Sequence, residues 1–447
     1  MSSCSLLRFR PRQPSAGRLG RTALGLGSLG RAARAAALAL ASLALSGCDA
    51  LMPAAPDPST ELVGAIEGLS APQRAMHAAG DAEFARVFGT ADGLGPVFVA
   101  PSCESCHAGD GKGHPLFNIT RFGRMQAGTF DPMRSAGGPQ LQDRAIAGYL
   151  AERVPGAATG VARFLAPAVT GLGYLEAVDD TTLLRLEDPN DADNDGISGR
   201  VQLVDANDLL ARVVSLEGVA AEGGPTRGTL VGGRYIGRFG KKALAVNLLQ
   251  QVATAYHQDM GITSELIPDE IFNPAVGAFS GDGVPEPEVS ANVVNAVTFY
   301  IKTLRVPPRR NLSDPDVIAG EQLFLTGGCA ACHLPTLTTG ASHIAVLDRV
   351  TFHPFTDLLL HDMGPELDDG YTEGRATTSE WRTAPLWGLG LAAATQGGTP
   401  RLLHDGRATS IREAIGYHGG EAAASRAWFN ALSADQQRRL LAYLNSL

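Results

Sequence analysis

Two stretches of the chain carry apolar side chains at helical spacing, and a helix-like run with start signals lies upstream of each, so the four stretches form two similar pairs. The first pair covers residues 70–88 and 289–304, and the second covers residues 314–325 and 434–447. Apolar residues three or four positions apart are typical of one face of an amphipathic helix. Ser70 and Ser433 are each followed three residues later by Gln, which is the signature of a capping box at a helix start. The pattern therefore predicts two repeats of an opening and a closing helix.

Four of the six cysteines lie in two copies of one motif, one copy in each repeat. The copies are Cys103, Cys106 and His107, and Cys329, Cys332 and His333. Cys-Xaa-Xaa-Cys-His is the attachment motif of haem c, in which both thiols form thioethers and the adjacent His binds iron. A single CxxC could be a redox disulfide or half of a zinc site. Two copies, each followed by His, instead favour two covalently bound haem c groups.

The order of helix, haem motif, loops and closing helix predicts a mainly α fold with two cytochrome c-like domains. We expect the N-terminal domain at residues 61–305 and the C-terminal cytochrome c domain at residues 306–447, with consecutive prolines in the link between them. The first repeat is much longer than the second. It therefore carries a large loop-rich insertion, expected within residues 150–260, which suggests that something is bound or enclosed there.

Charge is unevenly placed along the chain. The 447 residues have a net charge of −9, which argues against nucleic-acid binding because phosphate contacts need a basic face. Residues 1–47 nevertheless hold seven Arg and no acidic residue. A basic leader before an acidic body is typical of an exported protein.

An apolar run at residues 35–46 ends just before Cys48. The run is too short to span a bilayer but suits a signal peptide. Small residues lead directly into the Cys, as in bacterial lipoproteins, where this residue is lipidated. The sequence thus predicts a lipoprotein signal peptide at residues 1–47, a lipid on Cys48, a Pro-rich tether at residues 48–60, and a membrane-anchored lipoprotein in the periplasm.

The sixth ligand of each iron decides whether the site carries electrons or reacts. A Met thioether closes the site and raises the reduction potential, whereas an open position admits peroxide. Met363 is the only methionine after the second motif and is predicted to be the sixth ligand there, with His361 as its rival. His404 and His418 are expected in supporting or surface positions.

The first repeat gives no clear sixth ligand. An open site is one alternative, as expected of a haem that reacts with peroxide. The candidate ligands in this repeat are His114, Met125, Met133, His257 and Met260.

An Asp-rich loop in the insertion is a candidate calcium site. Asp191, Asp193 and Asp195 alternate before Gly196, as at the start of a calcium-binding loop. An EF-hand would end this loop with Glu, but Gln202 stands there. A surface turn rich in Asx residues is therefore the alternative.

Longer strings of residues resemble one known family over residues 60–447. In order, they are CESCH (103–107), GGPQLQDRAIAG (137–148), GISGR (196–200), GRFG (237–240), DMGIT (259–263), CAACH (329–333), TDLLLHDMG (356–364), WRTAPLWG (381–388) and HDGR (404–407). The chain resembles the bacterial di-haem oxidoreductases, which are often labelled thiol oxidoreductases. That family is similar to the di-haem cytochrome c peroxidases and to the maturation enzyme of methylamine dehydrogenase.

The resemblance implies an enzyme that passes electrons from a C-terminal His/Met haem, with Met363 as its ligand, to an N-terminal catalytic haem. A small soluble electron-donor protein would reduce the C-terminal haem. Glu176 is the candidate general acid for cleaving peroxide. A non-enzymatic electron-transfer lipoprotein is the alternative, and an oxygenase is a third reading.

Overall fold

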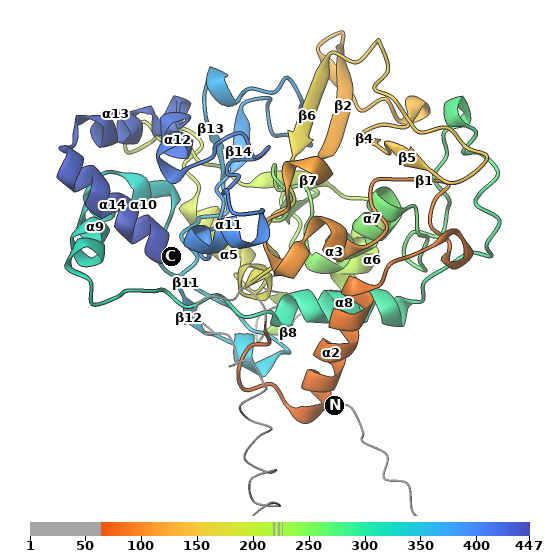
Figure 1. Cartoon of the computed structure of the whole chain (residues 1–447), viewed down its shortest axis with the longest axis horizontal. Helices are drawn as coiled ribbons and strands as arrows, with labels where there is room; N and C mark the ends of the chain where they lie inside the picture. Colours follow the sequence, from red (N-terminus) through yellow and green to blue (C-terminus); the bar gives the residue numbers. More distant parts are fainter. Residues whose placement is uncertain (1–63, 218–219, 222–223, 226) are drawn as a thin grey trace, which may run out of the picture. The chain divides into compact units, whose positions relative to one another are not determined.

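The computed structural model describes residues 64–447 except 218–219, 222–223 and 226 (Figure 1). The predicted signal peptide, Cys48 and the tether lie outside these residues. No helix in the described part is long and apolar enough to cross a membrane.

The four helices predicted from hydrophobic spacing are all present, with short helices between them. The α-helices are α2 (Ala71–Ala85), α3 (Cys103–Cys106), α4 (Leu172–Glu176), α5 (Asp180–Leu186), α6 (Asp208–Glu217), α7 (Leu248–Met260), α8 (Ala291–Thr303), α9 (Pro315–Thr326), α10 (Cys329–Cys332), α11 (Ala392–Thr395), α12 (Ile411–Gly416), α13 (Ala423–Ala431) and α14 (Ala434–Ser446). Capping boxes at Ser70 and Ser433 begin α2 and α14.

The opening and closing helices of the first repeat cross closely at a glycine. A Cβ on Gly80 of α2 would lie 2.1 Å from the carbonyl oxygen of Ala296 on α8, so only Gly allows this approach. One turn along, the rings of Phe84 and Tyr300 meet with centroids 5.4 Å apart. The opening and closing helices of the first repeat therefore pack directly against each other.

The second repeat uses the same crossing. A Cβ on Gly320 of α9 would lie 2.1 Å from the carbonyl oxygen of Arg439 on α14, and the rings of Phe324 and Tyr443 are 5.3 Å apart. Figure 1 shows α9, α10, α12, α13 and α14 gathered on one side, and α2, α3, α7 and α8 on the other. The two repeats thus share one helical plan.

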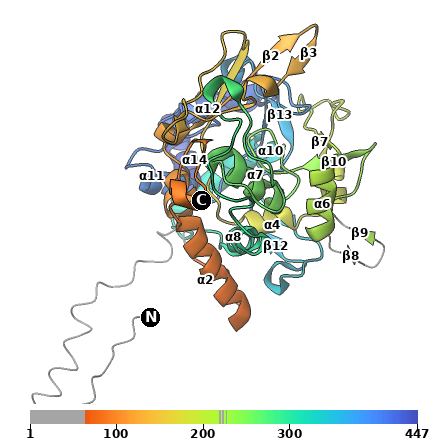
Figure 2. The same cartoon turned by 90° about the vertical axis from the view of Figure 1, so that its right-hand side faces the viewer.

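Short strands fill much of the space between these helices. They are β1 (Val97–Phe98), β2 (Ile119–Gln126), β3 (Thr129–Asp131), β4 (Gln140–Leu141), β5 (Arg144–Ala145), β6 (Gly160–Phe164), β7 (Gln202–Asp205), β8 (Ala220–Ala221), β9 (Gly224–Pro225), β10 (Arg234–Gly237), β11 (Leu337–Thr338), β12 (Thr351–Phe352), β13 (Leu360–Asp362) and β14 (Glu380–Arg382). All named pairs are antiparallel. β2 pairs with β3, β4 and β6, and its hairpin with β3 extends away from the helices (Figure 2).

The strand content corrects the expected fold class. Of the described residues, 38% are helical and 14% are in strands, so the fold is mixed rather than mainly α. Part of the insertion that we expected to be loop instead pairs as β6 with β2 and as β7 with β10. In β6 burial alternates along the strand, with Gly160, Ala162 and Phe164 buried and Val161 and Arg163 exposed.

Two large hydrophobic cores lie behind the two cysteine motifs. The first core takes in most buried residues before 305, and the second surrounds α9 and α14. The first core also contains Leu337, Phe352, Leu358, Leu359 and Trp387 from the second repeat. Because the described residues belong to one compact unit, the division at residue 305 stays a prediction.

Candidate haem sites

The first cysteine motif forms the one-turn helix α3 on the surface of the first core. The hydroxyl of Ser102 accepts the backbone N–H of Ser105 and caps this turn, and His107 ends it. Nδ1 of His107 lies 2.7 Å from the carbonyl oxygen of Pro167. Burial lowers the pKa of His107 to about 4, so the ring is neutral and Nδ1–H is the donor.

The second motif repeats this arrangement on the second core. Cys329 and Cys332 bound α10, and Nδ1 of His333 lies 3.0 Å from the carbonyl oxygen of Phe355. Burial lowers the pKa of His333 to about 4. Phe355 has a φ of 54°, a conformation that non-glycine residues rarely adopt, and packing in the core holds it there.

The chemistry of these side chains fits haem c at both motifs. With Nδ1–H bound to a carbonyl, each His keeps the lone pair of Nε2 for a metal, and its ring orientation is fixed. The four cysteines are unpaired. Burial raises the pKa of Cys103 and Cys106 to about 12 and that of Cys329 to about 11, so these groups are protonated thiols.

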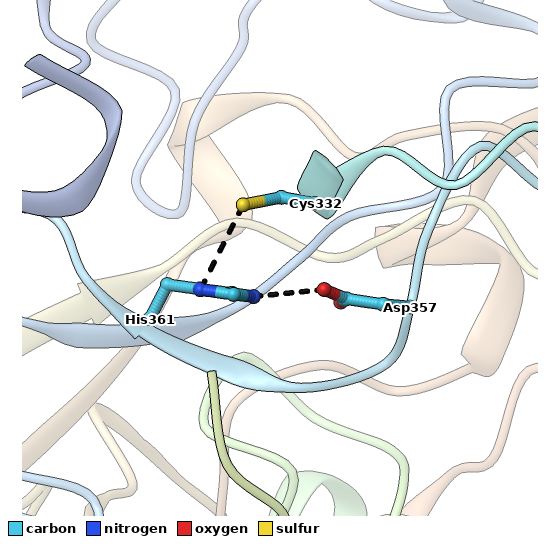
Figure 3. Close-up of side chains that lie close together, drawn as sticks. All are labelled: Cys332, Asp357 and His361. Atoms are coloured by element: carbon cyan, nitrogen blue, oxygen red, sulfur yellow. Dashed lines mark hydrogen bonds and ion pairs between the residues drawn. The ribbon is translucent and has the colours of Figure 1, made fainter. Parts of the chain in front are cut away.

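His361 is held at both ring nitrogens. Nε2 lies 2.8 Å from a carboxylate oxygen of Asp357, and Nδ1 lies 3.7 Å from the Cys332 sulfur (Figure 3). Nδ1 also lies 2.7 Å from a carboxylate oxygen of Glu421. Burial alone would lower the pKa of His361, but the bonds to Asp357, Cys332 and Glu421 raise it to about 12. The ring is therefore an imidazolium, which has no lone pair to bind iron.

Met363 follows β13 directly and contacts an aromatic cluster. This partly buried side chain packs against a group that includes Phe164, Leu367, Tyr371 and Trp381. Its predicted role as an iron ligand stays a prediction.

His418, expected in a supporting or surface position, lies opposite His333. The two ring centroids are 6.5 Å apart, with 41° between the ring planes. Nδ1 of His418 lies 2.8 Å from the carbonyl oxygen of Ala414 in α12. Burial lowers the pKa of His418, so this ring is neutral as well. No spacing pattern in the sequence connects it to His333.

Trp381 forms a layered stack. His404 lies flat against the indole, with centroids 3.7 Å apart and 9° between the planes. The ammonium of Lys242 is also 3.7 Å from the indole centroid, and it donates to the carbonyls of Thr377, Thr378 and Glu380. A cation over the indole is favourable and stabilises this arrangement.

Two further lysines near His107 lack such partners. Among the described residues, the ammonium groups of Lys112 and Lys241 have no hydrogen bond or ion pair. Burial, followed by repulsion from Lys112 and Arg382, lowers the pKa of Lys241 to about 7. Lys241 in turn contributes to the low pKa of His107. Lys241 is thus only partly protonated at neutral pH.

Glu176, the candidate general acid, ends α4 beside two partners. One carboxylate oxygen lies 2.9 Å from the ammonium of Lys302, and the other accepts the backbone N–H of Leu248 at 2.6 Å. Glu176 also lines a cavity of about 90 Å³ together with Glu217 and Arg238. Its catalytic role stays a prediction.

The Asp-rich loop brings together a different trio from the predicted one. Carboxylate oxygens of Asp188, Asp191 and Asp193 lie within 4.8 Å of one another. Asp195 instead accepts the backbone N–H of Ile197 at 2.8 Å. Calcium binding in this loop stays a prediction.

A family model described as "Di-haem oxidoreductase, putative peroxidase" matches residues 158–447. The chain belongs to the di-haem oxidoreductase family. The match includes the second motif, Trp381 and His418, and the sequence-based recognition of the family is therefore confirmed.

Solved structures and curated proteins add little to the family assignment. The hydrazine synthase of Kuenenia stuttgartiensis is 13% identical, with 98% of this chain and 100% of that chain covered and a TM-score of 0.37. A MauG-like protein associated with microbial copper homeostasis is 17% identical, with 46% and 68% covered and a TM-score of 0.29. No curated protein matches the chain.

Proposed function

We propose that this di-haem oxidoreductase is a c-type peroxidase that acts outside the cytoplasm. Electrons enter at the C-terminal haem and pass to the N-terminal haem, where peroxide is reduced. The observation that carries the proposal is the matched environment of His107 and His333, each donating Nδ1–H to a backbone carbonyl beside a CxxC turn. Membership of the family supports the redox chemistry.

At each motif the cysteines and the histidine would hold different parts of the haem. Cys103 and Cys106, and Cys329 and Cys332, would supply the thioether bonds, while Nε2 of the adjacent His would bind iron. When bound, haem supplies one-electron transfer and an iron that reacts with peroxide. Two electrons and two protons convert one hydrogen peroxide into two waters. A small soluble electron-donor protein supplies the electrons, and Glu176 is the proposed proton donor.

The proposed setting is the periplasm, with the chain anchored to a membrane by lipid on Cys48. The basic leader and the apolar run before this residue support that setting. Calcium is proposed at the Asp-rich loop, where three carboxylates converge.

The test compares peroxide turnover in the purified haem-loaded chain and in two variants. Cys103→Ala/Cys106→Ala should abolish peroxide consumption but leave the other haem reducible by a small cytochrome c. Cys329→Ala/Cys332→Ala should block reduction by that donor. The mass of the intact chain should include two porphyrins.

The alternative, a carrier lipoprotein, makes a different prediction. Both irons would be six-coordinate and low-spin in every redox state, and the reduced protein would not consume peroxide. That result would overturn the peroxidase proposal while leaving the haems in place.

A further inference from the structure

The spacing of His333 and His418 matches two ligands on opposite sides of one metal ion. Imidazole nitrogens bind transition metals at about 2.0–2.1 Å. The centre of a five-membered ring with bonds of about 1.35 Å lies about 1.15 Å behind each ring atom. Two axial imidazoles on one ion therefore have centroids about 6.4 Å apart. The observed separation is 6.5 Å.

The tautomers of both rings also suit this geometry. Each Nδ1–H is used by a carbonyl, that of Phe355 for His333 and that of Ala414 for His418. In each ring Nε2 is the nitrogen left to bind a metal.

The position of His418 is fixed by its own helix and by the turn after it. The hydroxyl of Ser410 accepts the backbone N–H of Glu413 at the start of α12. The backbone N–H of His418 donates to the carbonyl of Ile415 at 3.0 Å. A Cβ on Gly419 would lie 2.8 Å from the carbonyl oxygen of Met363, so this turn packs tightly against β13. A ring held in this way needs little reorganisation to bind metal.

The rival ligands have other contacts. Both ring nitrogens of His361 are bound by carboxylates, and the side chain of Met363 packs in the cluster around Trp381. We propose that His418, rather than Met363, is the sixth iron ligand of the C-terminal haem, which is then a bis-histidine site. This inference rests on the proposed function, because it needs a haem bound at Cys329 and Cys332.

The inference changes what the C-terminal haem can do. A Met ligand raises the potential of a c-type haem. A bis-histidine haem has a lower potential, so a stronger reductant is needed to reduce it. The electron donor would then have a lower potential than the donor of a His/Met haem.

The test uses spectroscopy of the oxidised haem-loaded chain rather than turnover. The charge-transfer band of Met–iron ligation should be absent from the parent protein, and Met363→Leu should leave the low-spin resonance signal unchanged. His418→Ala should convert that signal to high-spin, with added imidazole restoring it. His418→Met should introduce the Met band and raise the midpoint potential.

His353→Ala is the matched control, because His353 is exposed and lies in the same repeat. It should leave the spectra unchanged. A Met band in the parent that disappears in Met363→Leu, or a low-spin signal that survives His418→Ala without imidazole, would overturn the inference. A chain whose mass lacks a second porphyrin would instead refute the proposed function. A His418→Ala protein that does not fold leaves the decision to Met363→Leu and His418→Met.

Discussion

The carboxylate of Glu421 holds the imidazolium of His361, with one oxygen 2.7 Å from Nδ1. Its other oxygen accepts the backbone N–H of Asp362 and the hydroxyl of Ser198. Glu421 thus joins β13, the Asp-rich loop and the turn that follows His418. Only 4% of the His361 side chain and 11% of the Glu421 side chain are exposed, so water can hardly solvate either charge if the other is removed.

Glu421→Gln should lower the free energy of unfolding by about 1–3 kcal/mol, because a charged hydrogen bond to a buried imidazolium is lost. Chemical denaturation would measure the change. Glu366→Gln is the control, since Glu366 forms an exposed pair with Arg426 at 3.6 Å and should cost less than about 1 kcal/mol. Equal losses in the two variants would contradict the assigned role.

Alanine at either helix crossing should destabilise the fold. In Gly80→Ala and Gly320→Ala the new Cβ would lie 2.1 Å from a backbone oxygen, so the helices must separate. Overpacking of this kind costs about 1–3 kcal/mol. Gly416→Ala in α12 has open space around its Cβ and should be nearly neutral or stabilising in thermal unfolding. A stable Gly80→Ala protein would show that the crossing is looser than described.

Two adjacent lysines should behave differently when changed to Met. Lys242→Met leaves three carbonyls without their donor and should lower the melting temperature clearly. Lys241→Met removes a buried, partly protonated ammonium that has no ion-pair partner among the described residues, and it should leave the melting temperature unchanged or raise it. The lost charge near His107 should instead lower the midpoint potential of the N-terminal haem, because nearby positive charge favours the reduced iron. Potentiometry that detects no shift would argue against this placement.

Stability should fall with rising pH through an acidic cluster. Carboxylate oxygens of Glu270, Asp282, Glu286 and Glu288 lie within 4.8 Å of one another. Burial, aided by neighbouring carboxyl groups, raises the pKa of Glu270 to about 8 and that of Glu288 to about 7 from 4.5. The folded chain therefore binds protons more tightly than the unfolded one, and this contribution is lost between about pH 4.5 and pH 8.

Glu286→Gln should make the fall of stability with rising pH less steep, because it removes a negative charge beside Glu270 and Glu288. Melting temperatures measured with a chelator at several pH values would show the slope. Glu265→Gln, at an exposed position nearby, should keep the parental slope. An unchanged slope in Glu286→Gln would mean that the cluster does not control the decline.

Variants of the ion pair between Glu176 and Lys302 can distinguish a structural role of Glu176 from a catalytic one. Glu176→Gln and Lys302→Met should both lower thermal stability, and the second should lower it more. Glu176→Gln leaves Lys302 its ion pair with Glu217, whereas Lys302→Met leaves both carboxylates without their cation. Peroxide turnover per haem then tests the proton-donor role. A sharp loss in Glu176→Gln that Lys302→Met does not share would support it. Equal turnover in the two variants would leave Glu176 a purely structural residue.

Local patterns in the sequence predicted the helices and both CxxCH turns. Hydrophobic spacing and capping residues are encoded within a few positions, so the crossing helices could be recognised. The carbonyls of Pro167 and Phe355 carry no side-chain signal, and only the folded chain places them against His107 and His333. The position of His418 likewise depends on packing between segments far apart in sequence.

The core behind the first cysteine motif is completed by Trp387 and other side chains that are synthesised much later than Cys103. A chain still lacking its second half would leave that core open to water. Attachment of the first porphyrin can therefore precede final burial of its pocket, and severed halves expressed separately should be poor substitutes for the continuous polypeptide.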